Sequence, residues 1–334
     1  MSKKRRKARK RRKQAREAAK KVLYTLITIV ILLAALIVAN EKWLHCKYIP
    51  STEKIIDFLG IERHPEVIVE QDEISVHFID VGQGDCIFID TPDKDMLIDC
   101  GEVEYASRVI RYLHRYDVRK LDYIIASHPH SDHMGGMSRI MTAFHVGEFI
   151  MPDVPSDMIP TLDFYTDAMN VVSAKGIALN YSQIGRSIEL CEGTRLDIIG
   201  PIGTGYSDLN SYSVIAKLVS GNRSFLFTGD TEKDAEYVLT DSWLIDISAD
   251  VIKVPHHGSS SSSSVGFVKR VYPKYAVFSV GADNTYGHPS TDVVAFYRAM
   301  DCEVLMTMHS GDIVFITDGN DIRYVEANSR DNAA

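Results

Sequence analysis

Short apolar runs separated by turn residues dominate the chain from residue 73 onward. The first run, Ile74–Asp80, carries Ile74, Val76 and Phe78 two residues apart, and Gly82 follows it. Apolar side chains at a period of two, bounded by glycine or proline, are typical of β-strands. By this criterion we predict strands at Ile74–Asp80, Cys86–Asp90, Asp95–Asp99, Leu121–Ala126, Glu148–Met151, Ser187–Leu190, Thr194–Ile199, Ser213–Val219, Ser224–Thr228, Asp250–Val254, Tyr275–Val280, Ile313–Ile316 and Ile322–Val325.

Helical spacing of apolar residues appears between these strands. Ala106–Tyr116 places Val109, Ile110 and Leu113 on one face of a helix. The same criterion predicts helices at Gly135–Phe144, Thr161–Ala174, Glu232–Leu239, Ser264–Val271 and Thr291–Met300. Because strands occur in runs with helices between them, we expect an α+β fold in which two sheets pack face to face under helices, a four-layer αββα sandwich.

The N-terminal region follows a different pattern. Residues 22–39 are apolar or weakly polar and carry no charge. A helix of that length crosses most of a bilayer, and a run that is apolar on every side is not typical of a core helix. A cleavable signal peptide is the alternative, but Ile37–Glu41 matches a small-x-small cleavage site poorly. We therefore predict one transmembrane helix, a retained signal anchor over 22–40.

Charge is divided unevenly along the chain. The formal net charge is −8, yet residues 1–21 carry about +12 and the remaining residues about −20. Basic residues beside a span stay in the cytoplasm. We expect a basic cytoplasmic tail (1–21), the anchor (22–40), a stalk (41–72), an extracytoplasmic domain (73–326) and a C-terminal tail (327–334). Nucleic-acid binding is the alternative use of the basic run, although contact with anionic lipid suits its position better.

The strongest chemical signal is the stretch Ser127–Gly136, which reads SHPHSDHMGG. It begins where a predicted strand ends, so His128 and His130, two residues apart, face one side. Asp132 and His133 follow in the turn and can face a second spot close by. Imidazole and carboxylate groups bind zinc and also suit manganese or iron. Without a metal, this many polar groups would each need a partner, so the stretch predicts a metal site.

More ligand types stand at the ends of two distant predicted strands. Ser224–Thr228 leads to Asp230, and Asp250–Val254 leads to His256 and His257. A lone Gly-Asp is more often a turn, and a lone His-His pair is more often incidental. Three strands that each deliver ligand types at their carboxyl ends form a much more specific pattern.

These residues resemble the metallo-β-lactamase superfamily, whose mark is HxHxDH followed by later Asp and His ligands. More narrowly, the chain is similar to the hydrolase domain of the ComEC/Rec2 competence proteins. The similar stretches, which extend over about residues 73–326, are His77–Asp85, Leu97–Gly101, Ser127–Gly136, Thr228–Asp230, Lys253–Ser259 and Tyr286–Ser290.

The resemblance implies a centre of two divalent ions, zinc or else manganese. His128 and His130 would bind one ion, Asp132 and His133 the other, and Asp230 would bridge them. Either His256 or His257 would complete the second ion. Many members supply a further His to the first ion, but here the only one in that interval is His145, which follows the motif too closely. Asn210 or a water is expected in its place.

Further residues have supporting roles by the same resemblance. Asp99 would orient a metal-binding His, and Gln83 and Asp85 lie in a glycine-flanked loop expected near the metals. Lys253 would either offset phosphate charge or line the domain surface. His288 is a candidate proton donor, although a His fixed in a turn is the alternative, and Ser259 is a candidate for substrate contact.

The resemblance implies a metal-dependent phosphodiesterase or nuclease, which the predicted anchor would place outside the cell membrane. In it, Asp132 or a neighbouring carboxylate would steer a proton from a metal-activated water. The acidic outer domain is unlike most DNA-binding proteins, so a small phosphoester or a cell-envelope polymer suits it at least as well. Hydrolysis of a lactone, thioester or other small ester is a second hypothesis, and a binding module without catalysis is a third. No obligate protein partner is indicated.

Overall fold

The computed structural model describes residues 69, 70 and 72–325, together with residues 20, 24 and 28. The chain divides into two compact units, Met1–Arg63 and His64–Ala334. The predicted anchor (22–40), the basic tail and most of the stalk lie outside the described residues, so they stay predictions. Among the residues described, no helix is both long enough and apolar enough to cross a bilayer.

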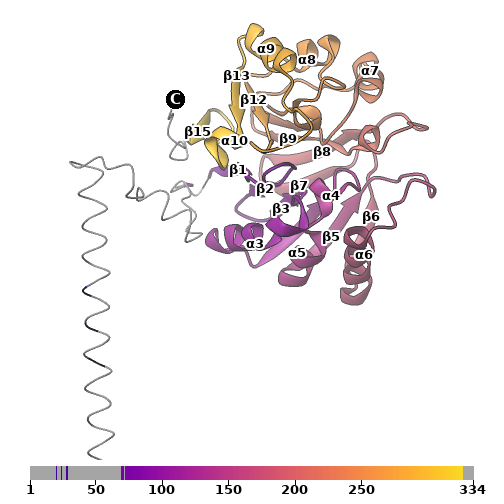
Figure 1. The fold of residues 1–334 in the computed structure, drawn as a ribbon. Coiled ribbons are helices and arrows are strands. Elements are labelled where there is room, and N and C mark those ends of the chain that lie inside the picture. Colours follow the sequence, from indigo (N-terminus) through magenta and orange to yellow (C-terminus); the bar gives the residue numbers. More distant parts are fainter. Residues whose placement is uncertain (1–19, 21–23, 25–27, 29–68, 71, 326–334) are drawn as a thin grey trace, which may run out of the picture. The chain divides into compact units, whose positions relative to one another are not determined.

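Two sheets form the C-terminal unit (Figure 1). The first has the order β15-β14-β1-β2-β3-β4-β5-β6. Its strands in chain order are β1 (Ile74–Phe78), β2 (Ile87–Asp90), β3 (Asp95–Ile98), β4 (Lys120–Ile125), β5 (His145–Met151), β6 (Ala178–Tyr181), β14 (Ile313–Thr317) and β15 (Ile322–Val325). Strands β3 to β6 run parallel to one another, while β1, β2, β14 and β15 pair antiparallel.

The second sheet has the order β13-β12-β11-β10-β9-β8-β7. Its strands are β7 (Ser187–Cys191), β8 (Thr194–Gly200), β9 (Ile215–Ser220), β10 (Arg223–Phe227), β11 (Val251–Lys253), β12 (Tyr275–Phe278) and β13 (Glu303–Met306). Strands β10 to β13 are parallel. The carboxyl ends of these four strands therefore lie at one edge of the sheet.

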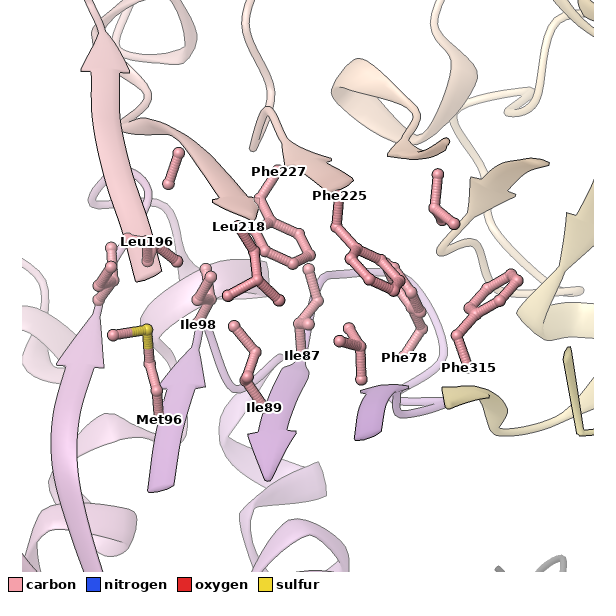
Figure 2. Packing of buried hydrophobic residues seen from close by; sticks show 14 of the residues in the cluster. Phe78, Ile87, Ile89, Met96, Ile98, Leu196, Leu218, Phe225, Phe227 and Phe315 are labelled. Carbon is pink, nitrogen blue, oxygen red and sulfur yellow. The ribbon is translucent and has the colours of Figure 1, made fainter. Parts of the chain in front are cut away.

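Apolar side chains pack between the two sheets. Phe78, Ile87 and Ile89 of the first sheet meet Phe225 and Phe227 of the second (Figure 2). All five are at most 1% exposed. Phe78 and Phe227 lie with ring centroids 6.3 Å apart. This interior cluster holds the sheets face to face, because each inner face can be covered only by the other.

Helices cover the two outer faces (Figure 1). A second apolar cluster packs α3, α5 and α6 onto the first sheet, and a third packs α7, α8 and α9 onto the second. The bounds of these helices are α3 (Ala106–Arg115), α5 (Met137–Ala143), α6 (Asp163–Lys175), α7 (Lys233–Asp241), α8 (Val265–Val271) and α9 (Thr291–Ala299). Two shorter helices are α4 (Ser131–Met134) and α10 (Thr307–Ser310). The expected α+β fold with two sheets is confirmed.

The strands β6 and β13 were not predicted from the sequence. All four side chains of β6 are exposed, so it lacks the alternation that marks a half-buried strand. β13 is short and lies at the edge of the second sheet, next to β12. Most of the other elements lie within two or three residues of their predicted bounds.

Candidate metal centre

Strand ends from both sheets meet at one place. In the first sheet, β3 ends before Asp99 and the neighbouring parallel strand β4 ends before His128. In the second, β10 ends before Asp230, and its parallel neighbour β11 leads to His257. Parallel strands deliver the residues that follow them to the same edge of a sheet, which is why side chains far apart in sequence converge here.

A close backbone approach holds the HxHxDH stretch in position. Asp85 N donates to the carbonyl oxygen of Asp132 at 3.1 Å. At Gly84, whose φ is +133°, a Cβ atom would lie 2.2 Å from that same oxygen. Only glycine allows this approach. The loop after β1 is thereby locked against the start of α4.

Four side chains form the core of the centre: Asp132, His133, Asp230 and His257. His133 Nε2 lies 3.2 Å from Asp230 Oδ2. His257 Nε2 lies 3.2 Å from Asp132 Oδ2 and 3.3 Å from Asp230 Oδ2. One ligand atom from each residue falls within 4.8 Å of all the others. This geometry suits four ligands around one ion.

The polar atoms of this core also fit a metal. His133 Nε2 and Asp230 Oδ1 are buried without a hydrogen-bond partner among the described residues. Leaving such atoms unpaired in a protein interior is costly, whereas a cation would satisfy both. Nitrogen and oxygen donors in this mixture are those that zinc, manganese and iron accept. The residues present therefore fit a divalent ion.

The charges of the core act on one another. Burial opposes ionisation of Asp132 and Asp230, but His133 and His257 outweigh it and hold the pKa of both carboxyls below the usual value. Burial likewise disfavours the charged imidazoles, yet Asp230 and Asp132 raise the pKa of His133 and His257 above the usual range. The two carboxylates thus attract positive charge to the point where their oxygens meet.

His128 and His130 lie together, as their spacing predicts. His128 Nε2 is 2.9 Å from His130 Nδ1, and the His128 ring lies 4.2 Å from that of His133. Burial lowers the pKa of both imidazoles, and His133 lowers them further. Neutral imidazole is the form that binds metals. That this pair binds its own ion stays a prediction.

Buried oxygen atoms contact the Nδ1 atoms of the two core histidines, His133 and His257. Asp99 accepts from His133 Nδ1 at 2.9 Å, and also from Ser127 N and Ser127 Oγ at 2.7 and 2.6 Å. This contact orients the His133 ring, the geometry expected of a supporting carboxylate. His257 Nδ1 lies 2.8 Å from the carbonyl oxygen of Ser279 and 3.4 Å from Asp85 Oδ1. The rings of His133 and His257 are therefore both held through Nδ1, while their Nε2 atoms face the carboxylates of the core.

Lys253 occupies neither of its two expected positions. Its side chain is fully buried, and Nζ lies 2.8 Å from Asp85 Oδ2. Nζ also donates to the carbonyl oxygen of Val254. The expectation that Lys253 lines the surface or meets phosphate is wrong, because the strand turns this side chain toward the other sheet. Its role is to neutralise a buried carboxylate.

The geometry separates His256 from His257. His257 belongs to the core, whereas His256 Nε2 lies 3.7 Å from Asp230 Oδ2 and His256 Nδ1 lies 3.3 Å from Glu232 Oε1. Asn210 Nδ2 also approaches Glu232 Oε1, at 3.4 Å. The Oδ1 atom of Asn210 is buried without a partner among the described residues. Asn210 thus remains a candidate for the position where other members carry a histidine.

Three other predicted residues lie around the centre. The ring of His288 is 5.4 Å from that of His256. Gln83 Oε1 accepts from Gly281 N at 3.3 Å, which joins the loop after β1 to the loop after β12. Ser259 Oγ contacts Ser261 Oγ at 2.8 Å and is nearly buried. The proposed roles of His288 in proton donation and of Ser259 in substrate contact stay predictions.

Sequence reasoning missed Ser213, Glu232 and Ser279. Ser213 Oγ lies 3.3 Å from His128 Nδ1 and accepts from Asp230 N at 3.0 Å, so it connects the two halves of the centre. Glu232 follows Asp230 by two residues, a spacing that was available as a signal. Ser279 acts through its main-chain carbonyl, which a sequence pattern does not mark.

Comparison with known proteins identifies the class. The family model described as the Metallo-beta-lactamase superfamily matches residues 79–282, so the chain belongs to this superfamily. The predicted resemblance is confirmed.

Curated relatives narrow the similarity. ComE operon protein 3 of Bacillus subtilis is 26% identical over 73% of this chain and 33% of its own length. Competence protein ComA of Neisseria gonorrhoeae is 29% identical over 76% of this chain and 34% of its own length. The chain thus spans about a third of these relatives. The solved structure of CmlA, a diiron β-hydroxylase from Streptomyces venezuelae, shares the fold at 13% identity, with a TM-score of 0.51 over 78% of this chain and 59% of that one.

Proposed function

We propose that this protein is a metal-dependent phosphodiesterase or nuclease-type hydrolase, held outside the cell membrane by the anchor at 22–40. The observation that carries the catalytic part is the core of Asp132, His133, Asp230 and His257. Its buried atoms His133 Nε2 and Asp230 Oδ1 have no hydrogen-bond partner among the residues that the structure describes. The binding-module hypothesis is less favoured, because a pure binding surface has no need for such a buried ligand set.

Divalent ions at this centre would supply Lewis acidity and a water-derived nucleophile at neutral pH. The chain itself does the positioning. Asp99 and the Ser279 carbonyl fix the two rings of the core. Asp132, whose side chain is 24% exposed, is the core residue most open to solvent, and as an ionised carboxylate it is suited to accept a hydrogen bond from the attacking water and so steer its proton. His288, beside His256, is suited to return one to the leaving group.

The names of the curated relatives support a nucleic-acid substrate. One is named Competence protein ComA, and another, from Haemophilus influenzae, is named Recombination protein 2. The acidic balance of the outer domain, about −20, points the other way and favours a small ester or a cell-envelope phosphodiester as the second candidate. One assay can compare them.

The test uses the fragment His64–Ala334, which contains all three apolar clusters. It is incubated with bis-p-nitrophenyl phosphate, single-stranded DNA or a lactone, with and without added Zn²⁺ or Mn²⁺. We expect metal-dependent cleavage of the phosphodiesters, which Asp132→Ala/His133→Ala abolishes. His145→Ala, at an exposed histidine of β5, is the matched control and should retain activity. Turnover of the lactone alone would contradict the phosphodiesterase proposal.

A further inference from the structure

Apolar side chains are exposed at the end of the second sheet opposite the metal centre. Because β10 to β13 are parallel and the ligands follow their carboxyl ends, the segments that lead into β11 and β12 lie at the other end. Trp243 and Leu244 stand in the segment between α7 and β11, and Tyr272 stands between α8 and β12. Their exposed fractions are 86%, 98% and 74%.

The segment that carries Trp243 and Leu244 has a defined conformation. The guanidinium group of Arg270, on α8, donates to the carbonyl oxygens of Leu239 and Thr240 in the last turn of α7. It also donates to those of Ser242 and Ile245, which flank the apolar pair in this segment. The Trp243 ring lies over the same guanidinium, 5.3 Å away. The part-buried guanidinium of Arg270 therefore fixes the backbone on both sides of Trp243 and Leu244.

The following residues anchor the segment to the domain. Lys217 Nζ contacts Asp246 Oδ2 at 2.7 Å, and Ser248 donates from both N and Oγ to Asp246 Oδ1. Ile247 is 1% exposed and joins the cluster beneath α7, α8 and α9. The apolar side chains of this segment thus divide, with Ile247 directed inward and Trp243 and Leu244 outward. A tryptophan and a leucine held out in water are unfavourable unless another surface covers them.

The chain also enters the domain at this end. β1 runs from Ile74 toward the loop of Gln83 and Asp85 at the metal centre, so the residues before Ile74 join the first sheet at its opposite end. Those residues include the apolar run 22–39 and some 30 residues after it. At a reach of up to ~3.5 Å per residue, that linker allows the domain to touch the bilayer in which the run would be inserted.

We propose that Trp243, Leu244 and Tyr272 form a bilayer-contacting edge that rests on the lipid surface and leaves the metal centre facing the aqueous side. Tryptophan and tyrosine favour the interface between water and lipid, and leucine favours the hydrocarbon beneath it. This inference rests on the proposed anchor, which would hold the domain close to lipid. The resulting orientation suits a water-borne polymer as substrate and not a membrane lipid.

The test measures contact between one tryptophan and lipid. The chain has two tryptophans, so Trp43→Phe leaves Trp243 as the sole reporter. This full-length variant is reconstituted into phosphatidylcholine vesicles, with or without brominated acyl chains. We expect bromine to remove roughly half of the Trp243 emission, as an interfacial position implies. The control, Trp43→Phe/Trp243→Phe/Tyr286→Trp, places the reporter in the His288 loop, where Tyr286 is 72% exposed, and should keep its emission.

A second arm separates this edge from the anchor. The fragment His64–Ala334, which lacks residues 22–39, is sedimented with the same vesicles. Leu244→Ser and Trp243→Ser should each lower its partition about tenfold, the loss expected from one buried apolar side chain. The full chain is also floated with the vesicles on a density gradient. If it floats but Trp243 is not quenched, the contact between this edge and lipid is wrong and the anchor is supported.

If the full chain does not float, the anchor is wrong. Binding of the fragment to vesicles then decides whether the edge contacts lipid. Self-association of the fragment through Trp243 without vesicle binding would assign the edge to a second copy and overturn the proposal.

Discussion

The buried pair of Lys253 and Asp85 gives the sharpest prediction about stability. Nζ and Oδ2 are 2.8 Å apart, and the side chains are 0% and 1% exposed. In Lys253→Met, the Asp85 carboxylate stays buried but loses its counter-charge, because methionine fills the space without a donor. Breaking a buried pair in this way costs about 3–5 kcal/mol. We expect that loss in the free energy of unfolding of His64–Ala334, measured by urea denaturation at pH 7.

Two further variants complete this test. In Asp85→Asn/Lys253→Met no unpaired charge remains, so stability should return to within about 2 kcal/mol of wild type. Arg323 and Glu73 also lie 2.8 Å apart, but Arg323 is 51% exposed. Arg323→Met should therefore cost less than about 1 kcal/mol. A loss below about 1 kcal/mol in Lys253→Met, or a double variant that is no more stable than Lys253→Met, would contradict this prediction.

Three more predictions concern single residues of the same unit. Gly84→Ala puts a Cβ atom 2.2 Å from Asp132 O and should cost at least about 2 kcal/mol in urea unfolding while weakening metal binding; an unchanged midpoint would contradict it. Asp99→Asn loosens the orientation of His133 and should lower metal affinity about 10–100-fold in chelator competition, and unaltered affinity would count against that role. Burial and the nearby Asp90 carboxylate raise the pKa of Asp95 from its ordinary value of 3.8 to about 7. The fold therefore loses stability as the pH rises from about 4 to about 7, where the unfolded chain has released this proton and the folded chain still holds it. Asp95→Asn should therefore stabilise the unit by about 1–2 kcal/mol at pH 8.5 and hardly at pH 4, whereas an equal gain at both would sink the argument.

The candidate ligands were predictable because they follow strand ends. An apolar run identifies a strand, and the polar residues just after it must lie at an edge of the sheet. That reasoning placed His128, Asp230 and the pair His256–His257 at one edge from sequence. It could not choose between His256 and His257, since both residues adopt left-handed backbone conformations, with φ of 47° and 52°. Which ring then points inward depends on the turn and not on a strand period.

Lys253 shows a second limit of sequence reasoning. It lies two residues from Val251, so both side chains face the same way, toward the other sheet. A lysine at such a position is acceptable only because Asp85 meets it from the loop after β1. That contact joins residues 168 positions apart in the chain, so no local sequence pattern predicts it. The same holds for Ser213, which joins His128 to Asp230.

The amount of bound metal decides whether Asp132, His133, Asp230 and His257 belong to a metal centre. The fragment His64–Ala334 is loaded with Zn²⁺ or Mn²⁺, desalted and analysed for bound metal, beside Asp132→Ala/His133→Ala and the control His145→Ala. We predict about two divalent ions per chain in the wild type and the control, and a clear loss in the double variant. A wild-type fragment that retains no ion, or a double variant that retains all of them, would contradict it.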